Sequence, residues 1–115
     1  MILRQMAKQS LALNRVFSAL SDPTRRSMVA RLARGSASVS ELAAPLPMSL
    51  PSVVQHLKVL EDSGLVSSVK IGRVRTCRIE RKPFDAAQSW LGKQRAIWEA
   101  RFDRMDAIVK DLDDE

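Results

Sequence analysis

The sequence predicts one mainly α-helical domain that carries a small β-hairpin. Three stretches of the 115-residue chain support this fold class. Residues 38–66 contain the capping residues, prolines and glycine expected of two helices joined by a tight turn. Residues 66–79 change to an apolar period of about two, whereas residues 83–112 return to helical spacing. The expected order is therefore four helices, a hairpin and a final long helix.

Two helices are expected before the capping residue at position 38. The first covers residues 2–20, because apolar side chains recur there at mostly helical spacing. These side chains are Leu3, Met6, Leu13, Val16, Phe17 and Leu20. The second begins at Asp22-Pro23, with aspartate as the cap and proline in the first helical position, and runs to about Arg34. Its buried side chains are expected to be Met28, Val29 and Leu32.

Arg25 and Arg26 lie in the first turn of this second helix. Their positive charge is unfavourable there, because the helix dipole places a partial positive charge at the N-terminus. A polyanion bound nearby would offset this cost, although two solvated arginines are the plainer explanation.

Residues 38–45 are expected to form a short helix. Ser38 can cap it, and Glu41 lies three residues on, where the partner of a capping box belongs. Pro45 and Pro47 end this helix and stiffen the turn that follows.

The next helix begins at a second cap, Ser49, with Pro51 in its first turn, and it stops at Gly64. A projection at 100° per residue places five apolar side chains within an arc of roughly 120° that is expected to face the core. These side chains are Leu50, Val53, Val54, Leu57 and Leu60.

The opposite side of this helix is polar. It carries Pro51, Ser52, Gln55 and Lys58, with His56 at the boundary. A face that is merely solvated would more often carry both glutamate and lysine. Hydroxyl and amide groups near a helix N-terminus suit contacts with base edges in the major groove of DNA, and an ordinary helical hairpin is the alternative.

Residues 66–79 predict a β-hairpin with Gly72-Arg73 at its turn. Its apolar side chains are Val66, Val69, Ile71, Val74, Cys77 and Ile79. Its cationic side chains are Lys70, Arg73, Arg75 and Arg78, and no acidic residue lies between Asp62 and Glu80. Because folding needs little of this charge, the hairpin is expected to contact phosphates, with Arg73 at its tip best placed.

The last helix is expected to begin at Pro83 and to carry a wide apolar stripe. Leu91, Trp98, Met105 and Leu112 recur every seven residues, with Phe102 and Val109 between them and a second row of Trp90, Ile97 and Ile108. Such a stripe exceeds what one small core can cover. A self-complementary contact between two copies of the chain is its simplest use.

Charge is unevenly distributed along the chain. Residues 1–82 hold 14 basic and 5 acidic residues, a net charge of +9, whereas residues 83–115 hold 5 and 8, a net charge of −3. A basic body favours a polyanionic partner. Cys77 is the one cysteine, so no internal disulfide forms, and no stretch resembles a signal peptide or a membrane span of ~18 apolar residues. No membrane partner and a cytoplasmic location are therefore expected.

Taken together, these patterns resemble the winged helix–turn–helix repressors of the arsenic-repressor (ArsR) family. The resemblance covers nearly the whole chain. Its specific pieces are FSALSDPTRRSMVARL at 17–32, SVSELA at 38–43, QHLKVLEDSGLV at 55–66 and the Gly72-Arg73 turn.

The resemblance implies one winged helix–turn–helix domain over residues 1–115. The helix–turn–helix would occupy 38–64, with its recognition helix at 50–63, and the β-wing would occupy 66–80. Residues 1–20 and 83–112 would pair two chains into a homodimeric repressor of transcription. Because such a dimer presents two identical recognition helices, its double-stranded DNA operator is expected to be a pseudo-palindrome.

Two sets of site residues are predicted. The DNA-binding set is Ser49, Pro51, Ser52, Gln55, His56, Lys58, Lys70, Arg73, Arg75, Arg25 and Arg26. The dimer-interface set is Leu3, Met6, Leu13, Trp90, Leu91, Ile97, Trp98, Phe102, Met105 and Val109. No catalytic residue, metal ligand or cofactor is expected, and the sequence identifies no small-molecule effector.

Several positions depart from the family pattern. Relatives that sense soft metals carry a Cys-x-Cys pair where this chain has Ala43 and Pro45, and the other common metal site needs histidine on the last helix, which residues 83–115 do not contain. His56 is the family's recognition-helix histidine and is expected to be structural or phosphate-facing. The long helix with two tryptophans resembles the metal-independent branch of the family.

Three further departures concern the DNA-binding elements. Many relatives of this branch have arginine where Leu50 stands and serine where Val54 stands, so their base specificity does not carry over. Cys77 stands at a wing position that is commonly tyrosine. It is expected to be a small half-buried apolar residue rather than a redox switch.

Three rival functions are open from the sequence alone. An enzyme would have Cys77 and His56, on different elements, as its catalytic candidates. A protein-interaction module that docks through the last helix would leave the cationic hairpin unexplained. A non-specific architectural DNA-binding protein would explain the hairpin but would not select one operator.

Overall fold

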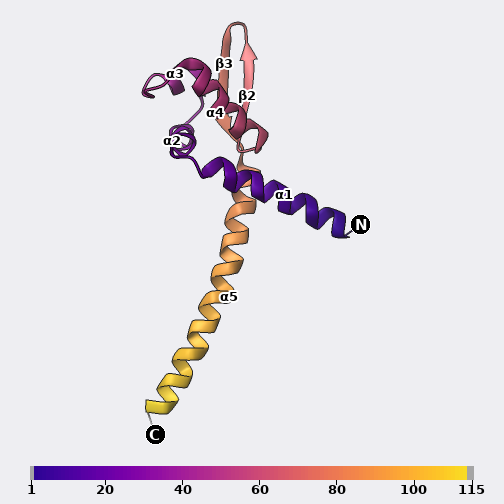
Figure 1. Cartoon of the computed structure of the whole chain (residues 1–115), viewed down its shortest axis with the longest axis vertical. Coiled ribbons are helices and arrows are strands. Elements are labelled where there is room, and N and C mark those ends of the chain that lie inside the picture. Colours follow the sequence, from indigo (N-terminus) through magenta and orange to yellow (C-terminus); the bar gives the residue numbers. More distant parts are fainter. Residues whose placement is uncertain (1, 114–115) are drawn as a thin grey trace.

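The computed structural model describes residues 2–113 and confirms a mainly helical fold with a small antiparallel sheet. The elements in chain order are α1 (Ile2–Leu20), α2 (Pro23–Leu32), β1 (Ala37–Ser38), α3 (Val39–Ala43), α4 (Leu50–Asp62), β2 (Val66–Ile71), β3 (Val74–Ile79) and α5 (Arg81–Asp113). Figure 1 shows the helix–turn–helix and the hairpin at one end of the molecule and the last turns of α5 at the other. The molecule is elongated, 74 × 40 × 21 Å, because α5 runs far beyond the other elements.

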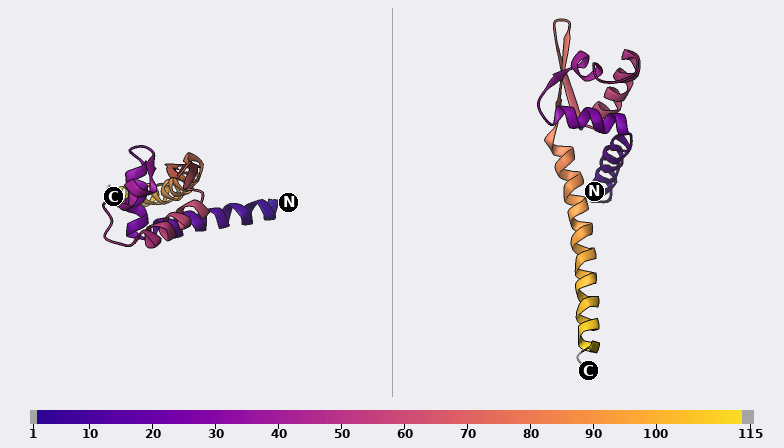
Figure 2. Two further views of the ribbon diagram at one scale, coloured as in Figure 1. Left: turned by 90° about the horizontal axis from the view of Figure 1, so that it is seen from above. Right: turned by 90° about the vertical axis from the view of Figure 1, so that its left-hand side faces the viewer.

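Helix α1 lies across the first turns of α5 (Figures 1 and 2). Phe17 of α1 meets Trp90 of α5 edge to face, with ring centroids 5.8 Å apart. Val16 near the end of α1 is buried, whereas Leu3 and Met6 near its start are exposed. The C-terminal part of α1 is therefore anchored to the core, and its first turns are not.

The core lies where α1, α2, α3, α4 and the sheet meet. Its largest fully buried side chains are Met28, Leu60, Leu65, Val53 and Cys77. Within residues 2–113 no polar or charged side chain is buried. Removal of apolar area from water, at about 25 cal/mol per Å², is therefore the main favourable term that holds these elements together.

The predicted capping residues begin the helices as expected. The Asp22 carboxylate accepts the Arg25 backbone N–H at 2.9 Å, and Pro23 takes the first position of α2. Ser38 and Glu41 form the predicted capping box at α3, with bonds of 3.1 and 3.3 Å. Local hydrogen bonds thus fix where α2 and α3 start.

The hairpin also forms as predicted. Ile71 pairs with Val74, so the connection has two residues, and Gly72 takes a positive φ of 64° at the first of them. Glycine is favoured at that position of a two-residue hairpin loop because it lacks a Cβ. Gly64 likewise has a φ of 80° where the chain leaves α4.

A third strand, β1, was not predicted. Ala37 pairs with Cys77 and Ser38 with Thr76, which adds β1 to the sheet in the order β1-β3-β2. Two residues are too short to show a period of two, so the sequence pattern could not reveal this strand. The pairing covers one edge of β3 and helps to bury Cys77, which is fully buried and not half-buried as predicted.

The predicted core face of α4 was too wide. Val53, Leu57 and Leu60 are buried as expected, but Leu50 is 56% exposed and Val54 is 48% exposed. The helical projection gives the direction of the apolar face but not the width that neighbouring elements cover. The surrounding elements cover the strip of α4 that carries the three buried residues, so the two remaining apolar side chains lie outside the core.

Two helix boundaries also differ from the prediction. Helix α2 ends at Leu32 and not near Arg34, because the N–H groups of Arg34 and Gly35 bond to carbonyls three residues back. Helix α5 begins at Arg81, two residues before Pro83. Proline is tolerated there because the first N–H groups of a helix have no intrahelical acceptor.

We expect Leu60→Ala to lower the free energy of unfolding by about 2–5 kcal/mol, because it leaves a cavity in the core. Leu50→Ala is the matched control on the same helix and should change stability by less than about 0.5 kcal/mol, because its side chain is exposed. Urea unfolding followed by circular dichroism, at one protein concentration, measures both. Equal losses in the two variants would contradict this assignment of the core face.

Candidate nucleic-acid interface

The outward surface of α4 carries the predicted base-reading residues. Pro51, Gln55 and Lys58 are exposed, while Ser52 and His56 are half-buried. The buried strip of the helix faces the core on the opposite side. The fold therefore holds these side chains on the surface of the helix–turn–helix.

The hydroxyl groups at the start of α4 are used within the helix. The Ser49 hydroxyl oxygen accepts the Ser52 backbone N–H at 3.4 Å, and the two hydroxyl oxygens lie 2.9 Å apart. In the described part of the chain, no hydrogen bond engages the Gln55 amide. Gln55 therefore has its full hydrogen-bonding capacity, two donors and one acceptor oxygen, available on this surface.

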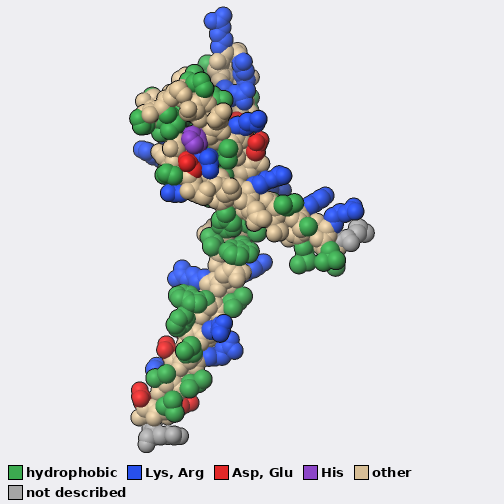
Figure 3. All heavy atoms as spheres, in the orientation of Figure 1, with side chains coloured by type: hydrophobic (Ala, Val, Ile, Leu, Met, Phe, Trp, Pro, Cys, Tyr) green, Lys and Arg blue, Asp and Glu red, His purple; other side chains and the backbone are tan. Residues whose placement is uncertain are grey.

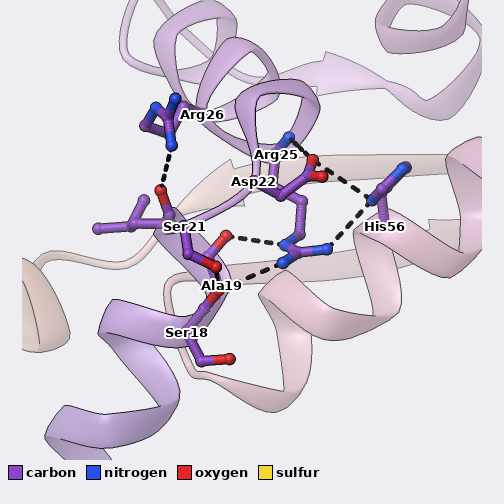
Figure 4. Close-up of polar contacts among 8 residues, drawn as sticks. Ser18, Ala19, Ser21, Asp22, Arg25, Arg26 and His56 are labelled. Atoms are coloured by element: carbon purple, nitrogen blue, oxygen red, sulfur yellow. Dashed lines mark hydrogen bonds and ion pairs between the residues drawn. The ribbon is translucent and has the colours of Figure 1, made fainter.

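His56 belongs to a polar cluster that joins α4 to the end of α1 (Figure 4). The Arg25 guanidinium donates from Nε to the Ala19 carbonyl at 2.8 Å and from Nη2 to the Ser18 carbonyl at 3.2 Å. Its Nη1 lies 3.3 Å from His56 Nδ1, which in turn lies 3.8 Å from the Asp22 carboxylate. One arginine thus contacts the last turn of α1 and α4 together.

Arg26 has a similar position, because its Nη1 donates to the Leu20 carbonyl at 2.8 Å. Arg25 and Arg26 therefore place their charge at the C-terminus of α1, where the helix dipole favours a cation. Arg26 is exposed as expected for a solvated arginine, whereas Arg25 is half-buried, and the charge of neither requires a polyanion to offset it. Their contact with DNA stays a prediction.

The Asp22 carboxylate completes this cluster. The hydrogen bond from the Arg25 backbone N–H lowers the pKa of Asp22 below its usual value near 3.8, and the charges of Arg25 and His56 act in the same direction. Desolvation of the carboxylate opposes this shift in its pKa. The ionised form of Asp22 is the one that caps α2 and interacts favourably with the charge of Arg25.

The base of the wing is tied to the end of α4. The Ser68 hydroxyl donates to Glu61 at 2.6 Å, and Arg75 donates to the Ser68 hydroxyl at 3.0 Å. Arg75 also lies 3.9 Å from the Glu61 carboxylate. Lys70 pairs with Arg75 in the sheet, so both side chains are on the face of the hairpin that looks toward α4.

The tip of the wing is exposed and cationic. Arg73 occupies the turn beside Gly72, and Figure 3 shows Lys and Arg side chains gathered along the hairpin. The structure thus brings Lys70, Arg73 and Arg75 to the same end of the molecule as the outward surface of α4. A single surface with a polar helix and a cationic hairpin suits simultaneous contact with base edges and phosphates.

The predicted dimer-interface residues lie away from this surface. All of them are exposed except Leu13, which is half-buried. Figure 3 shows apolar side chains along the length of α5, and Trp98 and Phe102 pack edge to face with centroids 4.9 Å apart. One chain therefore leaves the apolar stripe of α5 in water.

Residues 2–113 offer few side chains for metal binding or thiol chemistry. That part of the chain contains no group of three or more His, Cys, Asp or Glu side chains that could hold a metal ion. Burial raises the pKa of the Cys77 thiol, and the nearby Glu61 carboxylate raises it further.

Among the described helices, none is both long and apolar enough to cross a membrane.

A helix–turn–helix whose second helix presents a polar outward face, beside a cationic two-stranded wing, defines a winged helix–turn–helix protein, a class that binds DNA. Comparisons with known proteins agree with this class.

A family described as helix-turn-helix domain matches residues 20–69. The HTH-type transcriptional regulator Rv2034 of Mycobacterium tuberculosis is 46% identical over 67 residues, 58% of this chain and 63% of that protein. The matched segment thus spans less than two thirds of that relative.

Solved structures extend the similarity over more of the chain. The crystal structure of an ArsR family transcriptional regulator, RHA00566, is 53% identical with a TM-score of 0.75, over 78% of this chain and 93% of that chain. The solution structure of the homodimeric winged helix-turn-helix DNA-binding domain of Mb0332 from Mycobacterium bovis is 26% identical with a TM-score of 0.64, over 84% and 87%. The present chain belongs to the ArsR family of winged helix–turn–helix transcriptional regulators, which are DNA-binding proteins and not enzymes.

We expect the Asp22 carboxylate to make stability depend on acid pH. Because its pKa is lowered in the folded state, it stabilises the protein at pH values above about 4, and this stabilisation is lost as pH falls through the lowered pKa. Asp22→Ser should retain a capping oxygen for α2 but remove this titration, so its stability should fall less steeply below pH 4. Urea midpoints between pH 7 and pH 2 test this, and parallel curves for the two proteins would contradict it.

Proposed function

We propose that this protein is a homodimeric transcriptional repressor that binds a pseudo-palindromic operator without a family metal site. The observation that carries the proposal is the pairing of one base-reading surface, on α4 and the wing, with a separate exposed apolar surface on α5. The first surface fits DNA and the second fits another copy of the chain.

The DNA part of the proposal rests on the division of roles at the first surface. Gln55 presents a free amide on the outward side of α4, and glutamine can pair bidentately with adenine in the major groove. Lys70, Arg73 and Arg75 present charge from the neighbouring wing, where phosphates of the same duplex would lie. If the protein instead only bound another protein through α5, this cationic wing would have no role.

The dimer part rests on apolar area. Trp98 is 58% exposed and Ile97 is 60% exposed, and the stripe to which they belong continues over most of α5. An exposed stripe of this length is a typical interface, and a two-fold contact would cover it on both chains. The related Mb0332 domain, which is described as homodimeric, supports the same arrangement here.

Metal independence rests on the residues at the family's metal positions. Ala43 and Pro45 offer no thiolate, and Nδ1 of His56 lies 3.3 Å from the Arg25 guanidinium, a cation that would oppose a metal ion at that nitrogen. A closed tetrahedral zinc site needs four nitrogen, sulfur or carboxylate ligands. Repression is carried over from the ArsR resemblance, and the cytoplasmic location from the lack of a signal-peptide or membrane-span pattern in the sequence.

We expect two substitutions to separate base contacts from phosphate contacts. Gln55→Ala should weaken binding to the true operator by roughly 1–3 kcal/mol per half-site and should change binding to random DNA little. Arg73→Ala should weaken binding to both and lower the salt dependence by about one phosphate contact per subunit. Titrations on operator and scrambled duplexes at several salt concentrations measure these effects.

Arg95→Ala is the matched control for loss of charge, since Arg95 lies on α5 and pairs with Glu99 at 2.8 Å. It should leave both affinity and salt dependence nearly unchanged. The assigned roles are wrong if Gln55→Ala weakens both duplexes equally, or if Arg73→Ala leaves the salt dependence as it was.

We expect Trp98→Glu to give monomeric or insoluble protein, because each pair of chains would bury two carboxylates in an apolar contact. Ile71→Glu, at an apolar wing position that is 76% exposed, is the matched control and should remain dimeric. Sedimentation equilibrium distinguishes these states. A soluble monomeric wild-type protein would refute the dimer.

A further inference from the structure

The first turns of α4 carry two aliphatic side chains that lie outside the core. Leu50 and Val54 are 56% and 48% exposed, and neither belongs to the buried cluster or to the partly buried residues that pack against it within residues 2–113. They are four residues apart, so they lie one above the other on the helix. Together they form a small aliphatic ridge on the first turns of the recognition helix.

This ridge lies on the side of α4 that faces the wing. At 100° per residue, Leu50, Val54 and Glu61 fall within about 40° of one another around the helix. Glu61 accepts a hydrogen bond from Ser68 of β2, which identifies this flank as the wing side. The opposite flank carries His56, which contacts Arg25 of α2.

The ridge is therefore flanked by amide and cationic side chains, which are groups that can bind DNA. Gln55 follows Val54 directly on the outward surface, and the cationic pair Lys70 and Arg75 lies on the wing face that looks toward α4. At 100° per residue the ridge lies about 100–140° from Gln55 around the helix, so it borders the outward surface on the wing side. Insertion of the first turns of α4 into the major groove would bring this flank to base edges beside those that Gln55 reaches. The ridge cannot hydrogen-bond to a base edge, because it has no polar atom beyond the backbone.

The major groove offers one apolar group on its base edges, the C5-methyl group of thymine. We infer that Leu50 and Val54 determine operator specificity by packing against thymine methyl groups next to the base that Gln55 contacts. This inference rests on the proposed function and names the groups that this recognition helix reads. Removal of the thymine methyl group from water favours binding to thymine over cytosine at these positions, because burying an apolar carbon lowers the free energy of the complex.

The inference can be tested by replacing thymine with uracil, which removes the methyl group and leaves every hydrogen bond of the base pair intact. An operator is first selected from random duplexes with the 115-residue protein. Each thymine of one half-site is then replaced singly by deoxyuridine, and dissociation constants are measured for the wild type, Leu50→Ala and Val54→Ala. For the wild type we expect about a fourfold weaker affinity at one or two positions, the value of one buried methyl group.

The variants decide whether the ridge reads those methyl groups. At a position read by Val54, the deoxyuridine effect should disappear in Val54→Ala, because its partner is already gone, and Leu50→Ala should behave likewise at its own position. Val59→Ala is the matched control. Val59 is 39% exposed on the same helix but lies in the groove against Leu11 and Asn14 of α1, so its variant should keep the full fourfold effect.

Two outcomes would overturn the inference while leaving the proposed function intact. One is specific operator binding that is insensitive to deoxyuridine at every position. The other is a deoxyuridine effect that keeps its size in both ridge variants. Failure to select any preferred duplex would instead refute the proposed operator-binding function itself, and the ridge inference with it.

Discussion

The recognition surface depends on one constraint, which is that a helix lying on a small core can bury only a strip of its circumference. Val53, Leu57 and Leu60 fill that strip on α4. Their burial fixes the rotation of the helix about its own axis, so every other residue of α4 has a set direction. Gln55 points outward for this reason, and not because of any contact of its own.

Two further groups of contacts hold α4 at a fixed position relative to its neighbours. At one flank Arg25 connects it to the end of α1, and at the other Glu61 connects it to the base of the wing through Ser68 and Arg75. These contacts are polar and partly exposed, so each contributes modestly to stability. Their main effect is geometric, because they set the wing and the recognition helix at one spacing.

Local signals in the sequence predicted the parts of the fold that local physics determines. The caps at Asp22 and Ser38 and the glycine turn at Gly72 need only neighbouring residues, and they formed as expected. The misses depend on distant partners. The exposure of Leu50 is set by how far other elements reach around α4, and the contact between Arg25 and His56 joins positions 31 residues apart. Neither leaves a trace in periodicity or spacing.

The three partners of the Arg25 guanidinium differ in how far they depend on the side chains at their positions. Two of them, at Ser18 and Ala19, are main-chain carbonyls, which exist whatever side chain occupies those positions. The third is the His56 ring, which depends on the residue chosen for the recognition helix. The contact of α2 with α1 thus needs arginine at position 25 alone, while the link to α4 needs a particular side chain at both positions. A different side chain at position 56 would therefore remove the contact with α4 without releasing Arg25 from the end of α1.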